Sequence, residues 1–315
     1  MPDASLPRTD FGAFTASRLC FGTLTMSPLQ ANFTLQQGAD LIIHAHQMGV
    51  DFVDTADLYD TYPHIALALK HCPGLRVSTK CYAYDEPTAR AALERAFAIG
   101  RERIDVMMLH EQESEHTLRG HRRALDFFRE QQAKGIIGCV GISTHRVAGV
   151  LAAAKARLDI VHPILNMRGL GIQDGSLADM ERACQTARDA GVRVLGMKAL
   201  GGGHLIAQAQ EAMAWAWSRP YLDAIAIGMK SADEIAWHVT VAGGKQPDRA
   251  LAERTVGQPR HLLIHDWCEG CGACVVRCRH GALRLVDGRA VVDHNACVLC
   301  GYCAAVCKEF CIKVI

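Results

Sequence analysis

The chain has 315 residues, of which 50% are hydrophobic and 21% are charged, so its composition is that of a globular protein and excludes a disordered one. Its 34 Lys and Arg residues nearly balance 33 Asp and Glu residues, and a net charge of +1 without a basic run argues against nucleic acid or an acidic membrane as a partner. No stretch approaches about 20 uncharged apolar residues, and the N-terminus does not resemble an export signal. We therefore expect a cytoplasmic protein.

Eight short apolar runs, separated by longer amphipathic segments, lie between residue 18 and about residue 241. This alternation is typical of strand–helix units around a parallel sheet. The runs predict strands at Leu19–Phe21, Asp51–Asp54, Leu75–Thr79, Ile104–Leu109, Ile137–Ile142, Ile160–Ile164, Arg193–Met197 and Ala224–Ile227. Helices are predicted at Gln36–Met48, Pro87–Ile99, Thr117–Lys134, Ala178–Ala190 and Ala232–Val241, with Gly49, Gly100, Gly135 and Gly191 as helix stops.

Eight strand–helix units over this length fit an α/β protein built as a (β/α)8 TIM barrel, which typically has about 250 residues. A doubly wound open sheet is the alternative. The loop after the first strand, which begins with Gly22 and Thr23, lacks the glycine-rich phosphate turn of a dinucleotide-binding open sheet. The sequence therefore favours the barrel.

The pattern changes at the turn-rich segment that begins with Gly243, and the polar stretch up to Pro259 has no clear periodicity. We predict a barrel domain at residues 1–245, a linker at 246–260 and a small second domain at 261–315. About 55 residues cannot bury a large core, so the second domain needs an internal cross-link or a metal centre.

Nine of the 14 cysteines lie in the last 48 residues, and eight of them form two CxxCxxCxxxC runs. The first run supplies Cys268, Cys271, Cys274 and Cys278, and the second supplies Cys297, Cys300, Cys303 and Cys307. Without an export signal, metal or redox chemistry is a better interpretation than disulfides. The alternatives are a zinc site and a purely structural set of thiols, but zinc usually takes two separated CxxC pairs.

In a run of this kind the first three thiolates bind one four-iron cluster and the fourth binds the other. The spacing thus predicts two 4Fe-4S clusters, one held by Cys268, Cys271, Cys274 and Cys307, the other by Cys297, Cys300, Cys303 and Cys278. This part of the chain resembles the bacterial two-cluster ferredoxins, which implies a small α+β ferredoxin-like domain. Arg279 and Lys308 stand where those proteins usually have proline. Cys311 is expected to be a buried apolar residue.

Proton-active side chains stand at or just beyond three consecutive predicted strands, where barrel enzymes place their chemistry. They are Asp54 and Tyr59 after the second strand, Lys80 after the third and His110 after the fourth. An ammonium near a phenol should lower the phenol pKa from about 10 toward neutrality, so that Tyr59 exchanges protons. Asp54 would hold Lys80, and His110 would orient a substrate oxygen. The set is suited to reducing a carbonyl or oxidising an alcohol.

The Asp-Thr-Ala-x-x-Tyr block at residues 54–59, Lys80, the strand ending in His110 and the Gly141-Ile142-Ser143 segment resemble the aldo-keto reductases. The joined architecture is similar to the iron–sulfur branch of that family. The resemblance implies that Asp54, Tyr59, Lys80 and His110 form the catalytic tetrad.

The coenzyme positions match the family less well, since Thr144, His162 and Met197 replace residues that usually recognise or stack on nicotinamide. Lys198 and the turn at Gly201, Gly202 and Gly203 could cradle a phosphate, or the turn could be purely structural. NADP(H) and a flavin are both candidate coenzymes. The candidate coenzyme-binding residues are Gly22, Thr23, Ser143, Asn166, Lys198, Gly201, Gly202, Lys230 and Ser231.

These features predict an oxidoreductase in which two clusters exchange electrons with a barrel that acts on a small carbonyl or alcohol. A cluster moves one electron and a carbonyl takes two, so a converter such as a flavin is expected. A redox partner protein, a ferredoxin or a flavoprotein, would dock near Arg279 and Lys308. The alternatives are an NADPH-dependent reductase with structural or redox-sensing clusters and a non-catalytic electron-transfer protein that uses the barrel as a scaffold.

Overall fold

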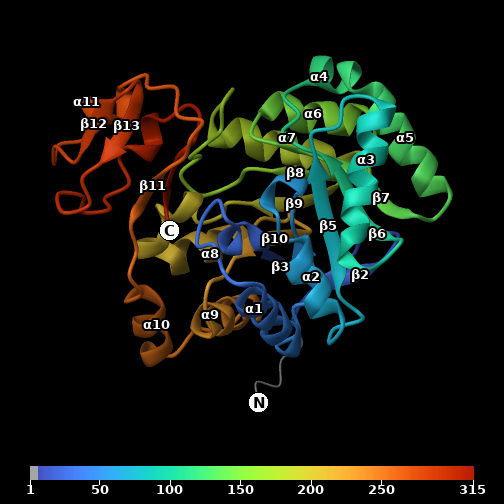
Figure 1. The fold of residues 1–315 in the computed structure, drawn as a ribbon, viewed down its shortest axis with the longest axis horizontal. Coiled ribbons are helices and arrows are strands. Elements are labelled where there is room, and N and C mark those ends of the chain that lie inside the picture. Colours follow the sequence, from blue (N-terminus) through green and yellow to red (C-terminus); the bar gives the residue numbers. More distant parts are fainter. Residues whose placement is uncertain (1–5) are drawn as a thin grey trace.

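The centre of the molecule is a closed barrel of eight parallel strands (Figure 1). The computed structural model describes residues 6–315. Each strand pairs with the next along the chain, and β10 pairs with both β9 and β3, so no edge is left open. The predicted barrel is confirmed and the open sheet is excluded. Its strands are β3 (Leu19–Gly22), β4 (Phe52–Asp54), β5 (Arg76–Cys81), β6 (Ile104–Leu109), β7 (Ile137–Thr144), β8 (Ile160–Pro163), β9 (Arg193–Met197) and β10 (Ala224–Gly228).

Helices surround the barrel, and several begin at a side chain that caps the first turn. Thr34, Asp85 and Ser176 each accept a hydrogen bond from the backbone three residues on, as capping residues do. Gly49 and Gly191 follow two of these helices with φ of 93° and 86°, which glycine adopts without strain. The helices are α1 (Leu35–Gln47), α2 (Tyr62–Leu69), α3 (Glu86–Ala96), α4 (Glu115–Gly120), α5 (Arg122–Ala133), α6 (Val147–Lys155), α7 (Leu177–Asp189), α8 (Ala209–Trp217) and α9 (Ala232–Ala242).

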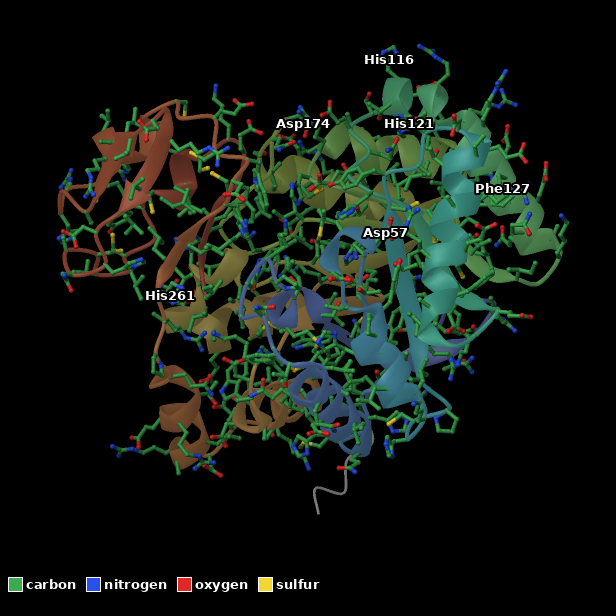
Figure 2. All side chains as sticks on the ribbon, viewed as in Figure 1. Asp57, His116, His121, Phe127, Asp174 and His261 are labelled. Carbon is green, nitrogen blue, oxygen red and sulfur yellow. The ribbon has the colours of Figure 1, made fainter. Side chains whose placement is uncertain are left out.

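The prediction of a single helix at residues 117–134 is wrong, because two helices, α4 and α5, meet at His121 (Figure 2). Gly120 ends α4, and glycine is a poor helix former. The His121 Nδ1 atom lies 3.1 Å from the Gln112 side-chain oxygen. This contact ties the junction to the loop that follows β6.

An aromatic plug closes the amino-terminal end of the barrel. The hairpin of β1 (Arg8–Asp10) and β2 (Thr15–Ser17) carries Phe11 and Phe14, whose rings stack with centroids 5.1 Å apart. Both rings contact Phe52 of β4 inside the barrel. The opposite end, where the carboxyl ends of the strands lie, is therefore the one available for a site.

The segment predicted as an irregular linker contains a helix, α10 (Arg249–Val256), which lies next to α9 (Figure 1). Asp248 caps it by accepting a hydrogen bond from Leu251, and Arg254 forms an ion pair with Asp233 of α9 at 3.0 Å. Leu251 is buried against the barrel core. Sequence periodicity missed α10 because it is short and only a few of its residues are buried.

The C-terminal residues form two small two-stranded sheets around their own core, beside the barrel (Figure 1). The last strand of the chain pairs with the first strand of this region, and His261, labelled in Figure 2, extends the pairing by two backbone hydrogen bonds with Ile315. The elements are β11 (Leu262–Ile264), α11 (Ala273–Arg277), β12 (Leu283–Val286), β13 (Arg289–Val292), and β14 (Ile312–Val314).

Short 3-10 helices occur in several of the loops. Those that bear on the site are η1 (Thr23–Met26), η2 (Asp57–Tyr59), η4 (Gly201–Gly203) and η5 (Ile206–Gln208). The other two are η3 (Phe97–Ile99) and η6 (Ala304–Val306). No helix within residues 6–315 is both long and apolar enough to cross a membrane.

Candidate active site and cluster sites

Asp54 and Lys80 form a buried ion pair between the neighbouring strands β4 and β5. The Lys80 ammonium lies 2.8 Å and 2.7 Å from the two Asp54 carboxylate oxygens and 2.6 Å from the Thr55 carbonyl oxygen. Lys80 is only 1% exposed. Burial alone would raise the pKa of Asp54, but the Lys80 charge and then His162 hold that pKa well below its usual range. Asp54 therefore stays charged beside Lys80.

Tyr59 and His110 lie next to this pair. Their rings meet edge to face with centroids 6.0 Å apart, and the Lys80 nitrogen lies 5.3 Å from the centroid of the Tyr59 ring. The structure thus brings together all four residues predicted as the tetrad. They come from consecutive strands because parallel strands in a barrel end at the same rim.

The expected drop in the Tyr59 pKa is not found. Burial, followed by the negative charge of Asp54, raises the pKa of Tyr59 well above 10.0. Lys80 donates hydrogen bonds to Asp54 and Thr55. The Asp54 carboxylate largely balances the Lys80 charge, so that charge does not lower the pKa of the phenol. Tyr59 is consequently a protonated group, suited to donating a proton to an alkoxide and unsuited to acting as a base.

His110 is neutral, because burial and then the Lys80 charge lower its pKa well below 6.5. Its ring stacks on Tyr82 with centroids 4.7 Å apart, and the Tyr82 hydroxyl donates to Glu111 at 2.5 Å. The His110 Nδ1 atom is buried without a partner within the described residues. A neutral imidazole with a free ring nitrogen can hydrogen-bond a substrate oxygen.

Sequence reasoning missed that His162 of β8 reaches the tetrad. Its Nε2 atom lies 3.5 Å from an Asp54 carboxylate oxygen, and its Nδ1 atom contacts the carbonyl of Leu195. His162 is fully buried and pairs in register with Ser143. The available signal was a histidine inside an apolar strand, which needs polar partners when it is buried.

An open cleft of about 1160 Å³ extends from Tyr59 across the ends of β9 and β10. Four of the predicted coenzyme-binding residues line it, namely Gly22, Lys198, Gly202 and Lys230. The cleft also takes in Arg260, which follows α10 and pairs with Glu234 at 2.9 Å. It is thus wide enough to reach from the tetrad to the α9–α10 side of the barrel.

The other predicted coenzyme-binding residues are engaged in their own loops and do not line the cleft. Asn166 uses its side chain to bond Arg168 and Leu170, and Ser143 holds the backbone of Glu111. Ser231 caps α9, while Thr23 bonds to Thr61. These contacts give Asn166, Ser143, Ser231 and Thr23 structural roles in this structure, and Gly201 packs against Leu170 and Leu205.

The glycine turn predicted as a phosphate cradle instead receives the C-terminal strand. A Cβ atom on Gly203 would lie 1.9 Å from the Val314 carbonyl oxygen, and one on Gly202 would lie 2.8 Å from the Lys313 side chain. His204 reinforces the contact with a 2.9 Å approach to the Ile312 carbonyl. Glycine is needed here because backbone meets backbone. The turn therefore packs against the C-terminal strand, which is the structural role given as the alternative to a phosphate cradle.

The eight cysteines of the two runs surround two cavities of similar size in the C-terminal region. Cys268, Cys271, Cys274 and Cys307 line a cavity of about 480 Å³, whereas Cys278, Cys297, Cys300 and Cys303 line one of about 510 Å³. These are the two interleaved sets that the spacing predicts. Within residues 6–315, no group of three or more His, Cys, Asp or Glu side chains is placed to hold a single metal ion. Cys311 is buried, as predicted, and also borders the first cavity.

Comparisons with known proteins agree with this geometry. The model of the aldo/keto reductase family matches residues 18–215, and the 4Fe-4S binding domain model matches residues 262–284. The chain belongs to the aldo/keto reductase family. It is accordingly an oxidoreductase, and it carries a C-terminal 4Fe-4S ferredoxin-type domain, as its sequence predicts.

Solved aldo-keto reductases have the same barrel. A putative aldo-keto reductase from Pseudomonas aeruginosa shares 19% identity with a TM-score of 0.65, covering 78% of this chain and 98% of the other. An aldo-keto reductase from Bacillus halodurans shares 16% identity at a TM-score of 0.62, with coverages of 81% and 95%. An aldo-keto reductase from Bombyx mori, solved in complex with NADP, shares 13% identity at a TM-score of 0.61, covering 80% of this chain and 92% of the other. A search of curated protein sequences found no match. At these identities the likeness concerns the fold.

Proposed function

We propose that this aldo-keto reductase reduces a small carbonyl compound at Asp54, Tyr59, Lys80 and His110, using electrons that pass through two 4Fe-4S clusters in the C-terminal domain. The observation that carries the proposal is the position of β14. This strand follows Cys307 and Cys311, which border one cysteine cavity, and its residues Lys313 and Val314 line the same cleft as Tyr59. The cluster domain thus forms part of the wall of the active-site cleft.

Each member of the tetrad has a defined task in carbonyl reduction. The substrate oxygen would lie between the Tyr59 hydroxyl and the neutral His110 ring, which orient it by hydrogen bonds. Tyr59 donates its proton to this oxygen as the carbon is reduced. The Lys80 ammonium, 5.3 Å from the ring centroid, then stabilises the phenolate until solvent restores the proton. Asp54 keeps Lys80 charged and in place.

Conversion of a carbonyl to an alcohol consumes two electrons and two protons. A 4Fe-4S cluster supplies one electron at a time, so the two clusters together hold the required pair. A bound flavin or nicotinamide, when present, would supply the two-electron chemistry at the carbon. The cationic side chains Lys198, Lys230 and Arg260 in the cleft would hold the phosphate groups of such a coenzyme.

The electrons would arrive from a redox partner protein, a ferredoxin or a flavoprotein. Cys271 and Cys300 are exposed, as are Arg279 and Lys308 beside the cysteine runs. An acidic or flavin-bearing surface would fit these cations.

The test is anaerobic reconstitution of the full chain, followed by iron and sulfide analysis and assays of aromatic aldehydes with reduced methyl viologen as the electron donor. Tyr59→Phe should lower turnover by about 10²- to 10⁴-fold, because the proton donor is lost. Tyr84→Phe is the matched control, since Tyr84 is 57% exposed. Turnover of Tyr59→Phe above a tenth of the wild-type rate would show that the tetrad does not donate the proton.

An NADPH-dependent carbonyl reductase with structural or redox-sensing clusters is the second candidate. The extent of the cleft, from Tyr59 to Lys230 and Arg260, favours it because an extended coenzyme needs such a groove. Adding NADPH to the reconstituted protein separates the two. Bleaching of the cluster absorbance indicates electron exchange between nicotinamide and clusters, whereas aldehyde reduction that proceeds with clusters unchanged supports the second candidate.

A further inference from the structure

Two lysines from different domains meet at one phenylalanine ring. Lys198 follows β9 of the barrel, and its ammonium nitrogen lies 5.1 Å from the centroid of the Phe310 ring. Lys313 belongs to β14 of the C-terminal domain, and its nitrogen lies 3.1 Å from the same centroid. Phe310 itself is buried in the core of the barrel. Both ammonium groups therefore approach the same ring at the junction of the domains.

Neither ammonium has a carboxylate partner within the described residues. Lys198 contacts the Nε2 atom of His145 at 2.7 Å, and Lys313 donates to the carbonyl oxygen of Phe310. Burial, and then the Lys198 charge, lowers the pKa of His145 well below 6.5, so this ring is neutral. The contacts satisfy some of the N–H groups but provide no carboxylate, and burial, followed by the Lys198 charge, lowers the pKa of Lys313 well below 10.5.

The other end of the cleft provides a contrast. There the guanidinium of Arg260 is paired with the buried carboxylate of Glu234 at 2.9 Å. Negative charge on Cys307, on Cys311 and then on Glu111 would raise the pKa of Lys313. The Glu111 carboxylate accepts a hydrogen bond from Tyr82 and, within the described residues, makes no ion pair with either lysine. Arg260 thus has a carboxylate partner at one end of the cleft, whereas Lys198 and Lys313 at the other end have none within the described residues.

Burying a charge without a partner is costly, so folded proteins usually pair it. Lys313 is only 4% exposed and Lys198 is partly buried, and both line the cleft that contains Tyr59. Two ammonium groups that line the wall of one cleft can recognise an anionic oxygen group. The missing counter-charge is accounted for if the cleft's occupant supplies it.

We propose that Lys198 and Lys313 form an anion-binding subsite, assembled by both domains, that holds a phosphate or carboxylate group of the molecule bound in the cleft. The inference rests on the proposed function, in which Lys198 already holds a coenzyme phosphate, and it deepens that function by adding Lys313 to the same subsite. It also assigns a ligand contact to the ferredoxin-type domain. An occupant of the cleft would then bridge the domains.

The test is calorimetric titration of the reconstituted full-length protein with inorganic phosphate at pH 7, without turnover. Lys198→Met and Lys313→Met should each weaken phosphate binding by at least about tenfold, since each removes one charge–charge interaction while keeping the side-chain volume. Lys313→Arg should retain most of the affinity because it keeps the charge. Lys134→Met is the control, as Lys134 is exposed at the end of α5.

Stability separates a binding role from a structural one. If the lysines are present for an anion, the methionine variants keep their iron content and unfold at the same or a higher temperature than wild type without phosphate, and phosphate stabilises only the wild type. Absence of phosphate binding by the wild type, or equal binding by both methionine variants, overturns the proposal. So does a loss of stability in both variants with phosphate affinity unchanged.

Two further measurements identify the source of the anion. Weaker NADPH binding in the methionine variants assigns the subsite to a coenzyme phosphate. A higher KM for 4-carboxybenzaldehyde, with the KM for benzaldehyde unchanged, assigns it to a substrate carboxylate. Binding is measured separately from turnover, so an inactive Tyr59→Phe enzyme that still binds phosphate leaves the subsite standing.

Discussion

At the scale of single residues, the buried pair of Asp54 and Lys80 organises the catalytic end of the barrel. Lys80 lies near the Tyr59 ring, and it donates hydrogen bonds to Asp54 and Thr55. His162 is a second basic side chain that approaches the Asp54 carboxylate. The pair therefore holds the Lys80 ammonium near Tyr59 while Asp54 balances its charge, and burial keeps the phenol protonated.

Lys80→Met should destabilise the protein by about 3 to 5 kcal/mol, because it leaves the Asp54 carboxylate buried without its partner. Denaturant unfolding at pH 7 measures the loss. The double variant Lys80→Met, Asp54→Asn should recover part of it, since no unpaired charge remains. Equal stabilities of the single variant and the wild type would show that the pair contributes nothing to the fold.

The charge of Lys198 should make anion binding depend on pH. Burial lowers the pKa of Lys198 to about 8, and Glu111, Lys80, Lys313 and His145 are the other titratable groups that influence it or face it. Because the ammonium form attracts an anion, the affinity for sulfate, whose charge is constant in this range, should fall as the pH rises from 7 to 9. Titrations across this range check the effect, and Lys198→Met should abolish that pH dependence. A rise in affinity over the same range would contradict it.

At the scale of elements, the decisive contact is between η4 and β14. The Gly201–Gly203 turn admits the backbone of β14, and the neighbouring Phe310 enters the barrel core. The C-terminal domain is therefore anchored to the barrel by a strand end and one aromatic side chain.

Gly203→Ala should loosen this anchorage by about 1 to 3 kcal/mol, because a Cβ atom at φ 91° would be strained and would meet the Val314 carbonyl at 1.9 Å. Gly244→Ala is the matched control, since Gly244 also has a positive φ of 74° but nothing lies within 4 Å of its added Cβ. Faster limited proteolysis between the domains in Gly203→Ala alone is the expected result. Identical behaviour of the two variants would place the effect in backbone strain and refute a docking role.

At the scale of the whole molecule, the interleaved cysteines join the two halves of the C-terminal domain. Cys307→Ser and Cys278→Ser should each reduce the iron content from about eight to about four atoms per chain, because the proposed assignment makes them ligands of different clusters. Iron analysis and electron paramagnetic resonance of the reduced protein check this. Cys184→Ala, within α7, should leave the iron content unchanged. Retention of all the iron in both serine variants would refute the ligand assignment.

The sequence by itself determined the barrel and its strands, and it named the four candidate residues that the structure brings together. The strand Ile104–Leu109 has the predicted bounds, since a run of apolar residues buried on both faces leaves a clear local signal. The cysteine spacing likewise predicted two sets of four thiols that the fold gathers around separate cavities. These signals are local, so they survive without knowledge of the fold.

Only the tertiary structure decided how the two domains share one cleft. The contact of His162 with Asp54, the seating of β14 on the glycine turn and the meeting of Lys198 with Lys313 all join residues far apart in the chain. It also decided the protonation of Tyr59, because burial outweighed the nearby ammonium. These outcomes depend on which side chains are buried together away from water. Periodicity and spacing along the sequence do not indicate which side chains those are.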